Sequence, residues 1–319
     1  MRLGIVGAGI MGAKVAAAEG LPGVRVTAVA DPVAGRAAAL AGRSGGTAFA
    51  GFPELLDSGA VDAVYLGLPH DGHADACVEA AARGVHVLID KPLCNTVAEA
   101  DRIIAARDAA GIVLMVGFSY RFRAEWLAAR ALVADGVIGE PLSVTDVIVE
   151  ATPDTPPWYW DAGRGGGILQ LQSHHCFDRL PWLVGLSLAE LTCRTTGLAG
   201  EAESAAAITG TFASGAVAGI ALSFGRTHVA GPRSLTVVQG SAGQLRIEQG
   251  GALAVSSTAG ERTESYAGDD WLHRQLSAFV AACAGREPAV PAAEDGRLAV
   301  VCAAAAAESA RTGQAVRLS

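Results

Sequence analysis

The stretch Leu3-Gly-Ile-Val-Gly-Ala-Gly-Ile-Met-Gly12 decides the fold of the N-terminal part of this chain. It carries the pattern G-x-G-x-x-G, formed by Gly7, Gly9 and Gly12. Residues 2–6 are mainly apolar and residues 10–19 favour a helix, so the glycines stand where a strand turns into a helix. There the first glycine permits a tight bend, the second lets the backbone approach a pyrophosphate, and the third lets the helix pack on the strand.

The pattern therefore predicts a dinucleotide-binding loop, with Ile10 and Met11 at the helix N-terminus that binds phosphate. A glycine-rich turn without a ligand is the alternative. A second strand, residues 24–30, ends at Asp31, about where a carboxylate that binds the ribose is expected. A 2′-phosphate at about 4 Å from this carboxylate would be repelled by about 4 kcal/mol, which favours NAD over NADP. Arg36, a nearby cation expected on a solvent-facing helix surface, keeps NADP as the alternative.

The composition is that of a globular protein with room for two domains. The chain has 319 residues, of which 51% are hydrophobic and 18% charged, and its formal charge is −8. This balance argues against disorder, nucleic-acid binding and attachment to anionic membranes. Six cysteines without a C-x-x-C pair favour reduced thiols in the cytoplasm over disulfides or a metal site. We expect no signal peptide, because a core strand begins at residue 2, and no membrane span.

Residues 1–121 are predicted to form the dinucleotide-binding domain, a doubly wound parallel sheet. The expected strands are 2–6, 24–30, 47–49, 61–66, 85–90 and 112–116, and the expected helices are 10–19, 33–43, 53–57, 72–83 and 98–110. Ligands bind beyond the carboxyl ends of such strands. Candidate cofactor contacts there are Leu68, Pro69, His70, His73, Asp90 and Lys91. His70 and His73 fit ordinary loop or cap positions equally well.

Asp90-Lys91-Pro92 follows the strand 85–90. Pro92 biases Lys91 towards an extended conformation at the crevice edge, where the nicotinamide end of a dinucleotide is expected. Proton transfer by this lysine would require its pKa to fall from about 10.4 to about 7 to 8, which is about 4 kcal/mol of environmental bias. A surface lysine whose amine reaches solvent is the alternative.

Residues 122–319 are predicted to form a second domain. Expected strands are 142–149, an antiparallel series within 210–224, 234–238 and 244–247, and expected helices are 126–135, 271–284 and 295–311. The strand 216–224 is apolar on both faces, which predicts self-association through the sheet. In the loop 152–161, Trp158 and Asp161 are candidates to stack on a sugar and to accept its hydroxyl hydrogens. A hydrophobic plug between domains is the alternative.

Gly165-Gly-Gly-Ile-Leu-Gln-Leu-Gln-Ser-His-His-Cys-Phe-Asp178 is the second informative stretch. The glycines suit a helix entry close to a ligand, and helical spacing continues beyond them. That spacing places His175 near Leu171, Gln172 and Asp178, and His174 near Gln170 and Asp178. Adjacent histidines point to different faces, so they do not form a metal site with Cys176. Each could also be a packing residue.

Three motifs in this order make the chain resemble the Gfo/Idh/MocA family of glucose-fructose oxidoreductases and inositol dehydrogenases, essentially from end to end. The motifs are the glycine loop 7–12, Asp90-Lys91-Pro92 in place of Glu-Lys-Pro, and the stretch 165–178; Glu294-Asp-Gly296 and Ser309-Ala-Arg-Thr-Gly313 are similar too. The resemblance implies that Lys91 and His175 are the catalytic pair. It also implies that the second domain is an α+β domain with an open-faced, mainly antiparallel sheet that forms homodimers or homotetramers.

One departure from the family pattern concerns the catalytic histidine. Many sugar and cyclitol dehydrogenases of the family have an Asp four residues before it, and this chain has Leu171. A leucine cannot orient an imidazole or stabilise its cation. Either Asp178, Gln172 or Asp161 takes over, or the chemistry differs.

The leading functional hypothesis is reversible, NAD-dependent oxidation of a secondary alcohol on a sugar, cyclitol or aminocyclitol. His175 is the candidate general base and Lys91 steers the alkoxide oxygen. The candidate substrate contacts are Lys91, Tyr120, Trp158, Asp161, Gln172, His174, His175 and Asp178. One alternative, favoured by Leu171, is reduction of a ketone, imine or double bond, or redox-assisted glycoside cleavage. Another is a nucleotide-binding regulator without turnover, against which the presence of Lys91 and His175 counts.

Overall fold

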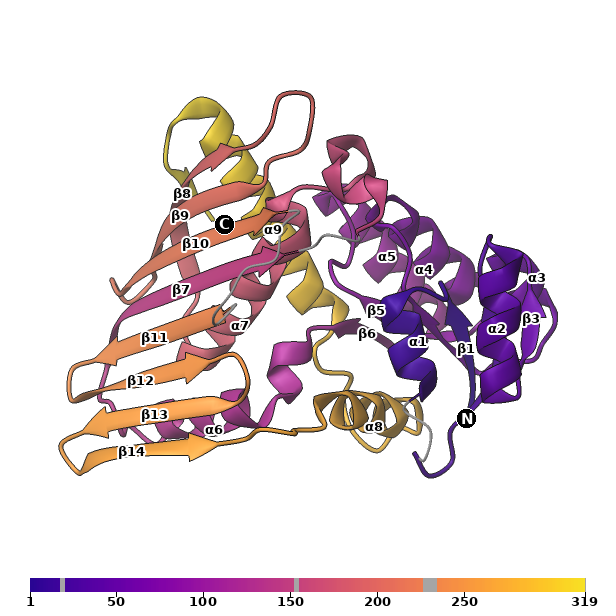
Figure 1. Ribbon diagram of the computed structural model, residues 1–319, viewed down its shortest axis with the longest axis horizontal. Coiled ribbons are helices and arrows are strands. Elements are labelled where there is room, and N and C mark those ends of the chain that lie inside the picture. Colours follow the sequence, from indigo (N-terminus) through magenta and orange to yellow (C-terminus); the bar gives the residue numbers. More distant parts are fainter. Residues whose placement is uncertain (18–20, 152–154, 226–233, 319) are drawn as a thin grey trace. The chain divides into compact units, whose positions relative to one another are not determined.

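Two compact units make up the computed structural model of this protein, which describes residues 1–17, 21–151, 155–225 and 234–318 (Figure 1). The first unit combines Met1–Ser119 with Leu272–Arg297, and the second combines Tyr120–Trp271 with Leu298–Ser319. The division into domains at residue 121 stays a prediction. In the described part of the chain, we find no helix with the length and apolar character needed to cross a membrane.

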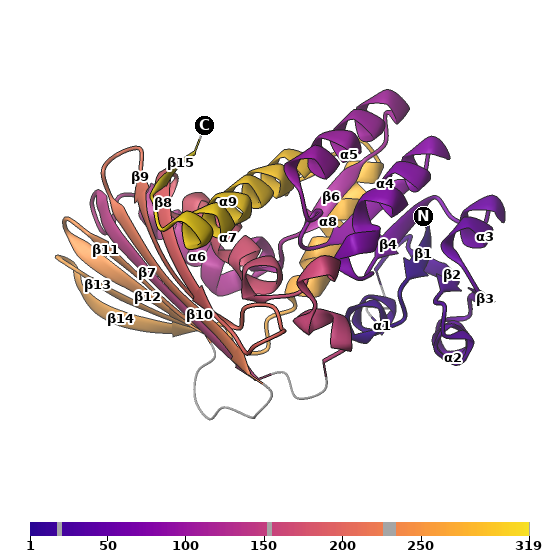
Figure 2. The ribbon, with the colours of Figure 1, turned by 90° about the horizontal axis from the view of Figure 1, so that it is seen from above.

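The first unit is built on a six-stranded parallel sheet with the order β3-β2-β1-β4-β5-β6. Its strands are β1 (Arg2–Val6), β2 (Arg25–Ala30), β3 (Thr47–Phe49), β4 (Ala63–Leu66), β5 (His86–Asp90) and β6 (Leu114–Gly117). The helices between them are α1 (Ile10–Ala17), α2 (Ala34–Ser44), α3 (Phe52–Asp57), α4 (His73–Ala82) and α5 (Val97–Ala110). Helices α4 and α5 lie on one face of the sheet and α1 and α2 on the other (Figure 2). The predicted doubly wound fold is confirmed, and its strand order reverses between β1 and β4, where such sheets bind ligands.

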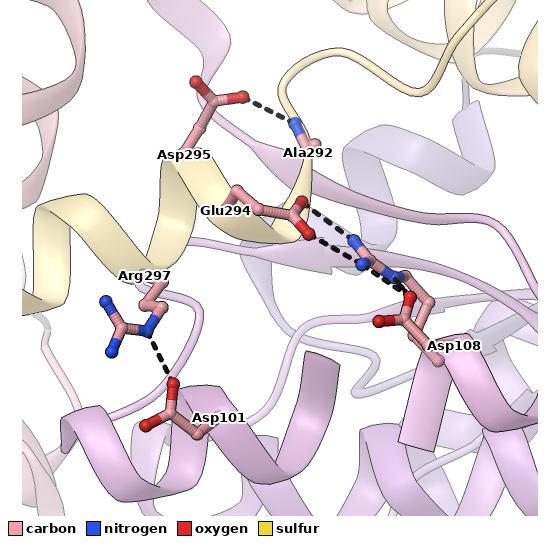
Figure 3. A network of polar contacts seen from close by, with 7 residues as sticks. Asp101, Asp108, Ala292, Glu294, Asp295 and Arg297 are labelled. Atoms are coloured by element: carbon pink, nitrogen blue, oxygen red, sulfur yellow. Dashed lines mark hydrogen bonds and ion pairs between the residues drawn. The ribbon is translucent and has the colours of Figure 1, made fainter. Parts of the chain in front are cut away.

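The segment Glu294-Asp-Gly296 attaches the start of helix α9 (Ala293–Thr312) to the parallel sheet unit (Figure 3). Arg107 on α5 binds both carboxylate oxygens of Glu294, at 2.8 and 2.6 Å, and Arg297 donates to Asp101. A Cβ on Gly296 would lie 2.8 Å from Cβ of Leu93, so only glycine lets α9 pack here. The segment that follows Lys91 is therefore held from this side by α9. Helix α8 (Trp271–Cys283) precedes it.

The second unit contains a nine-stranded sheet with the order β14-β13-β12-β11-β7-β10-β9-β8-β15. The strands are β7 (Pro141–Ala151), β8 (Leu188–Thr196), β9 (Ala205–Phe212), β10 (Val217–Gly225), β11 (Ser234–Gly240), β12 (Gly243–Glu248), β13 (Ala252–Ser257), β14 (Gly260–Ser265) and β15 (Val316–Arg317). Among the described strands of this sheet, only the pair β7–β10 is parallel, so the expected mainly antiparallel sheet is confirmed.

One face of this nine-stranded sheet is covered by α6 (Ala124–Ala134), α7 (His174–Val184) and the later part of α9 (Figure 2). On β10, Ile220 and Leu222 are buried under these helices, whereas Val217 and Ala221 face the opposite side and are exposed. No helix of the described residues covers that opposite face. Near the sheet edge, Ser309 of α9 accepts from the backbone N–H of Cys193 on β8 at 2.9 Å, which ties the second closing motif to the sheet.

Candidate functional site

The glycine loop after β1 has the shape that close approach of a phosphate requires. Gly7 has φ +93°, and a Cβ there would lie 2.2 Å from the Gly67 carbonyl oxygen. A Cβ on Gly12 would lie 2.0 Å from the carbonyl oxygen of Gly7, whereas one on Gly9 would meet no atom within 4 Å. Gly7 and Gly12 are thus required by packing, whereas the space beside Gly9 is open. Ile10 and Met11 begin α1 beside it.

Asp31 closes the ribose side of this loop. It follows β2 and is only 6% exposed. Its Oδ2 accepts the backbone N–H of Ala8 at 2.9 Å, and its Oδ1 accepts that of Val33 at 2.8 Å. Each carboxylate oxygen has a further lone pair to offer to a hydroxyl group. The carboxylate therefore fixes the loop and fits a ribose, so the residues present fit an adenine dinucleotide.

The loops that follow β4 and β5 meet around His73. This residue is completely buried, with Nδ1 2.8 Å from the Pro92 carbonyl oxygen and Nε2 3.0 Å from that of Leu68. The ring of His70 lies edge-on to it at 5.5 Å. Both nitrogens of His73 face backbone, which favours a positioning role over contact with the cofactor.

The segment around Lys91 leaves the sheet directly after β5. Asp90 accepts the backbone N–H of Lys91 at 2.9 Å, and the Lys91–Pro92 peptide bond is cis. Pro69 forms the turn before His70 at the end of the neighbouring strand β4. The structure thus brings Leu68, Pro69, His70, His73, Asp90 and Lys91 to one edge of the parallel sheet.

In the second unit, the glycine stretch leads into a π-helical turn rather than a uniform α-helix. This turn spans Leu169–Ser173 and continues into α7. The predicted helical spacing therefore holds in α7 but not through Leu169–Ser173, because a π-turn holds more residues than an α-turn. A Cβ on Gly166 would lie 2.4 Å from the Trp158 carbonyl oxygen, so the glycine entry packs tightly on the Trp158 loop.

Glu203 caps this helix entry, and no local sequence signal announced it. Its carbonyl oxygen accepts the N–H of Ile168 at 2.8 Å, and its Oε1 accepts that of Leu169 at 3.2 Å. Burial raises the pKa of the Glu203 carboxyl. Gly167 has φ +96°, a backbone conformation that favours glycine, and a Cβ there would also lie 2.6 Å from Oε1 of Glu203.

The two histidines differ in their surroundings. His174 is completely buried and its Nε2 lies 2.9 Å from Oε1 of Gln170, as the sequence spacing predicted. His175 is half-buried, with its ring edge-on to Tyr120 at a centroid distance of 5.0 Å. Tyr120 itself stacks on the guanidinium groups of Arg179 at 4.1 Å and Arg123 at 4.5 Å. The Tyr120 ring is thus held firmly against the side of His175.

The three residues considered as replacements for the family Asp each hold another group. The Asp178 carboxylate binds Arg121 through two hydrogen bonds, at 3.1 and 2.5 Å. Gln172 donates to Glu150 at 2.6 Å, which places a carboxylate on β7 beside the helix. Asp161 is exposed and accepts the N–H of Gly163 at 2.9 Å. Glu150 and Arg121, which bind two of the candidate substrate residues, were not predicted from the sequence.

The tryptophan loop is packed on itself and on the sheet. The rings of Trp158 and Tyr159 lie 4.5 Å apart, and Trp160 lies 4.6 Å from Phe224 on β10. Residues 152–154 of the predicted loop lie outside the described residues. Lys91 belongs to the first unit and His175 to the second. Their catalytic pairing stays a prediction.

Known proteins resemble this chain along both units. Residues 1–118 match the model of an oxidoreductase family with an NAD-binding Rossmann fold, and residues 126–246 match the GFO/IDH/MocA C-terminal domain. An inositol 2-dehydrogenase of Leifsonia xyli is 35% identical over 60% of this chain. The matched part spans only 56% of that relative's length. An inositol 2-dehydrogenase of Rhizobium meliloti is 30% identical over 97% of this chain and 96% of its own length.

A solved oxidoreductase domain protein of Kribbella flavida has a TM-score of 0.91 and 25% identity, and the match covers 100% of this chain and 99% of the other. The similarity therefore includes the nucleotide loop, the segment around Lys91 and the helix of His175. On the two family models, which together cover more than half of its residues, the chain belongs to the Gfo/Idh/MocA oxidoreductase family.

Proposed function

We propose that this protein is an NAD-dependent dehydrogenase that reversibly oxidises a secondary hydroxyl group of a sugar, cyclitol or aminocyclitol. The observation that carries the proposal is the glycine loop, in which the space beside Gly9 is open and the Asp31 carboxylate accepts the N–H of neighbouring Ala8. Relatives named inositol 2-dehydrogenase support the substrate class. A dinucleotide held at Gly9 and Asp31 would supply the nicotinamide ring as hydride acceptor.

In this proposal the chain's own residues handle the proton and the oxygen. His175 removes the hydroxyl proton, and Lys91 donates a hydrogen bond to the oxygen as negative charge develops there. Tyr120, packed edge-on against His175, limits the orientations of the imidazole. The Glu150–Gln172 pair offers acceptor and donor atoms to further hydroxyl groups of the substrate. Trp158, Asp161, His174 and Asp178 remain proposed substrate contacts.

A second candidate is reduction of a ketone, imine or double bond, or redox-assisted glycoside cleavage. Leu171 favours it, because this buried leucine stands where many dehydrogenases of the family have the Asp that supports the base. We also propose a cytoplasmic homodimer or homotetramer that associates through the uncovered face of the nine-stranded sheet. Exposed Val217 and Ala221 lie on that face.

Reduction of NAD by a panel of polyols, aminocyclitols and nucleotide sugars tests the function. With the best substrate, Lys91→Ala and His175→Ala should each lower kcat by about a hundredfold to ten thousandfold and leave NAD affinity unchanged. The exposed residues Lys14 and His273 supply matched controls, since Lys14→Ala and His273→Ala should keep normal turnover. Unchanged kcat in both site variants, or tight NADH binding without turnover on any substrate, would contradict the proposal.

A further inference from the structure

His73 is a buried imidazole placed between two segments that leave neighbouring parallel strands. Leu68 follows β4 and Pro92 follows β5, and these strands pair directly. The ring nitrogens lie 3.0 and 2.8 Å from the carbonyl oxygens of these two residues. The ring therefore spans the sheet edge on which the cofactor loops lie, without reaching its surface.

The His73 ring has two carbonyl contacts, and the number of N–H donors on the ring decides how many of them are hydrogen bonds. A carbonyl oxygen only accepts hydrogen bonds, and a neutral imidazole has one N–H to donate. Burial lowers the pKa of His73, and the positive charge of Lys91 lowers it further. The two carbonyl contacts and Asp90 raise this pKa but offset only part of the effect of burial. The ring is therefore neutral near pH 7, and only one of its two contacts carries a hydrogen. The contact with Pro92 is the shorter one.

Pro92 is the residue next to Lys91, and the residue after it is also fixed. Gly296 packs against Leu93 so closely that a Cβ would lie 2.8 Å from Cβ of that leucine. On the other side, the backbone N–H of Lys91 is bound to Asp90. A hydrogen bond to the Pro92 carbonyl completes the fixation of the backbone on which the lysine stands.

We propose that His73 is the positioning residue for Lys91: its Nδ1–H donates to the Pro92 carbonyl oxygen and fixes the backbone that aims the lysine amine. The ring touches neither substrate nor cofactor. This inference rests on the proposed function, in which Lys91 acts on the substrate oxygen. The Leu68 carbonyl then faces the ring nitrogen that carries no hydrogen.

Two amide substitutions separate the two contacts. The amide nitrogen of His73→Asn stands at about the position of Nδ1 and can still donate to Pro92, whereas that of His73→Gln reaches towards Leu68. We expect His73→Asn to keep most of the turnover and His73→Gln to lower kcat by about tenfold to a hundredfold, since displacement of a catalytic group by about 1 Å has effects of this size. NAD affinity and the melting temperature, measured alongside, should not follow this order.

A merely structural role would lower kcat and the melting temperature together in both variants. Equal losses in the two variants, or normal kcat in His73→Gln, would overturn the inference. Lys91→Ala serves as the reference: if it retains full turnover, the proposed function fails, and if it is inactive while the two His73 variants are alike, only the inference fails. Nitrogen-15 NMR of the ring in the intact wild-type protein provides an independent measurement, expected to find the Nδ1–H tautomer. The Nε2–H tautomer would contradict the proposal.

Discussion

Nη2 of Arg179 lies 2.7 Å from both carboxylate oxygens of Asp146, and neither side chain is accessible to solvent. Thr236 on β11 donates to the same carboxylate at 2.6 Å, and the Arg179 guanidinium stacks on Tyr120. The ion pair joins α7 to β7 at the centre of the second unit. Because Tyr120 contacts His175, this buried pair supports the residue proposed as the base.

Replacement of one partner of this pair should be strongly destabilising. Arg179→Met leaves the Asp146 carboxylate buried without its cation, so we expect the free energy of unfolding in urea to fall by about 3 to 5 kcal/mol. The double variant Arg179→Met/Asp146→Leu removes both charges and should lose less than the sum of the single changes. Additive losses in a double-mutant cycle would show that the pair is not coupled.

Alanine substitutions at the three glycines of the nucleotide loop should have different effects on stability and on NAD binding. Gly7→Ala and Gly12→Ala place a Cβ about 2 Å from a carbonyl oxygen, so both should lower the melting temperature. Gly9→Ala meets no protein atom and should keep normal stability while NAD binding, measured by fluorescence titration, is lost. Gly35→Ala in α2, where a Cβ also meets open space, is the matched control and should bind NAD normally. Normal binding by Gly9→Ala would place the pyrophosphate elsewhere.

The charge of Asp31 should set the choice between NAD and NADP. Asp31→Asn removes the charge and keeps an acceptor oxygen for only one of the backbone N–H groups of Ala8 and Val33, because its amide nitrogen is a donor. The ratio of kcat/KM for NAD over NADP should fall by about tenfold or more, because about 1.4 kcal/mol of relieved repulsion has this effect. Arg36→Ala is the control: a selective rise in the KM for NADP would identify Arg36 as a 2′-phosphate ligand.

Glu203 should add a pH dependence to the stability of the second unit. Its folded-state pKa is raised by burial, so its stabilising contribution is complete below the unfolded pKa and is lost as pH rises through the folded pKa. Glu203→Gln keeps an acceptor for Leu169 and cannot ionise. Its melting temperature relative to wild type should therefore increase from about pH 4.3 to pH 8. Exposed Glu287 supplies the control Glu287→Gln, and a pH-independent difference for Glu203→Gln would contradict this assignment.

The parallel sheet was predictable because most of its strands are apolar runs with a glycine near at least one end. Strand β14 was not predicted, since the segment Gly260–Ser265 is mostly exposed and carries Glu261, Arg262 and Glu264. Strand β13 was not predicted either, because the short segment Ala252–Ser257 consists largely of alanine and serine, which have little strand preference. Strands of these kinds are fixed by pairing with their neighbours rather than by their own residues.

The residues of the candidate site were predictable from the sequence, but the groups that hold them in position were not. The glycine loop, Lys91 and His175 stand in motifs, so a sequence names them. The partners of His73 are backbone carbonyl groups, which every residue has, and a residue pattern cannot select Leu68 and Pro92 from the rest. Glu203 lies far along the chain from the helix that it caps, and such pairs form only when the fold is complete.

The π-helical turn at Leu169–Ser173 has a consequence for how the second unit can vary. Deleting one residue from this segment would restore an unbroken α-helix and swing the side chains on either side of the deletion by about 100° relative to one another. The direction in which the His175 side chain points therefore depends on the number of residues between the glycines and His175 as much as on the identity of those residues.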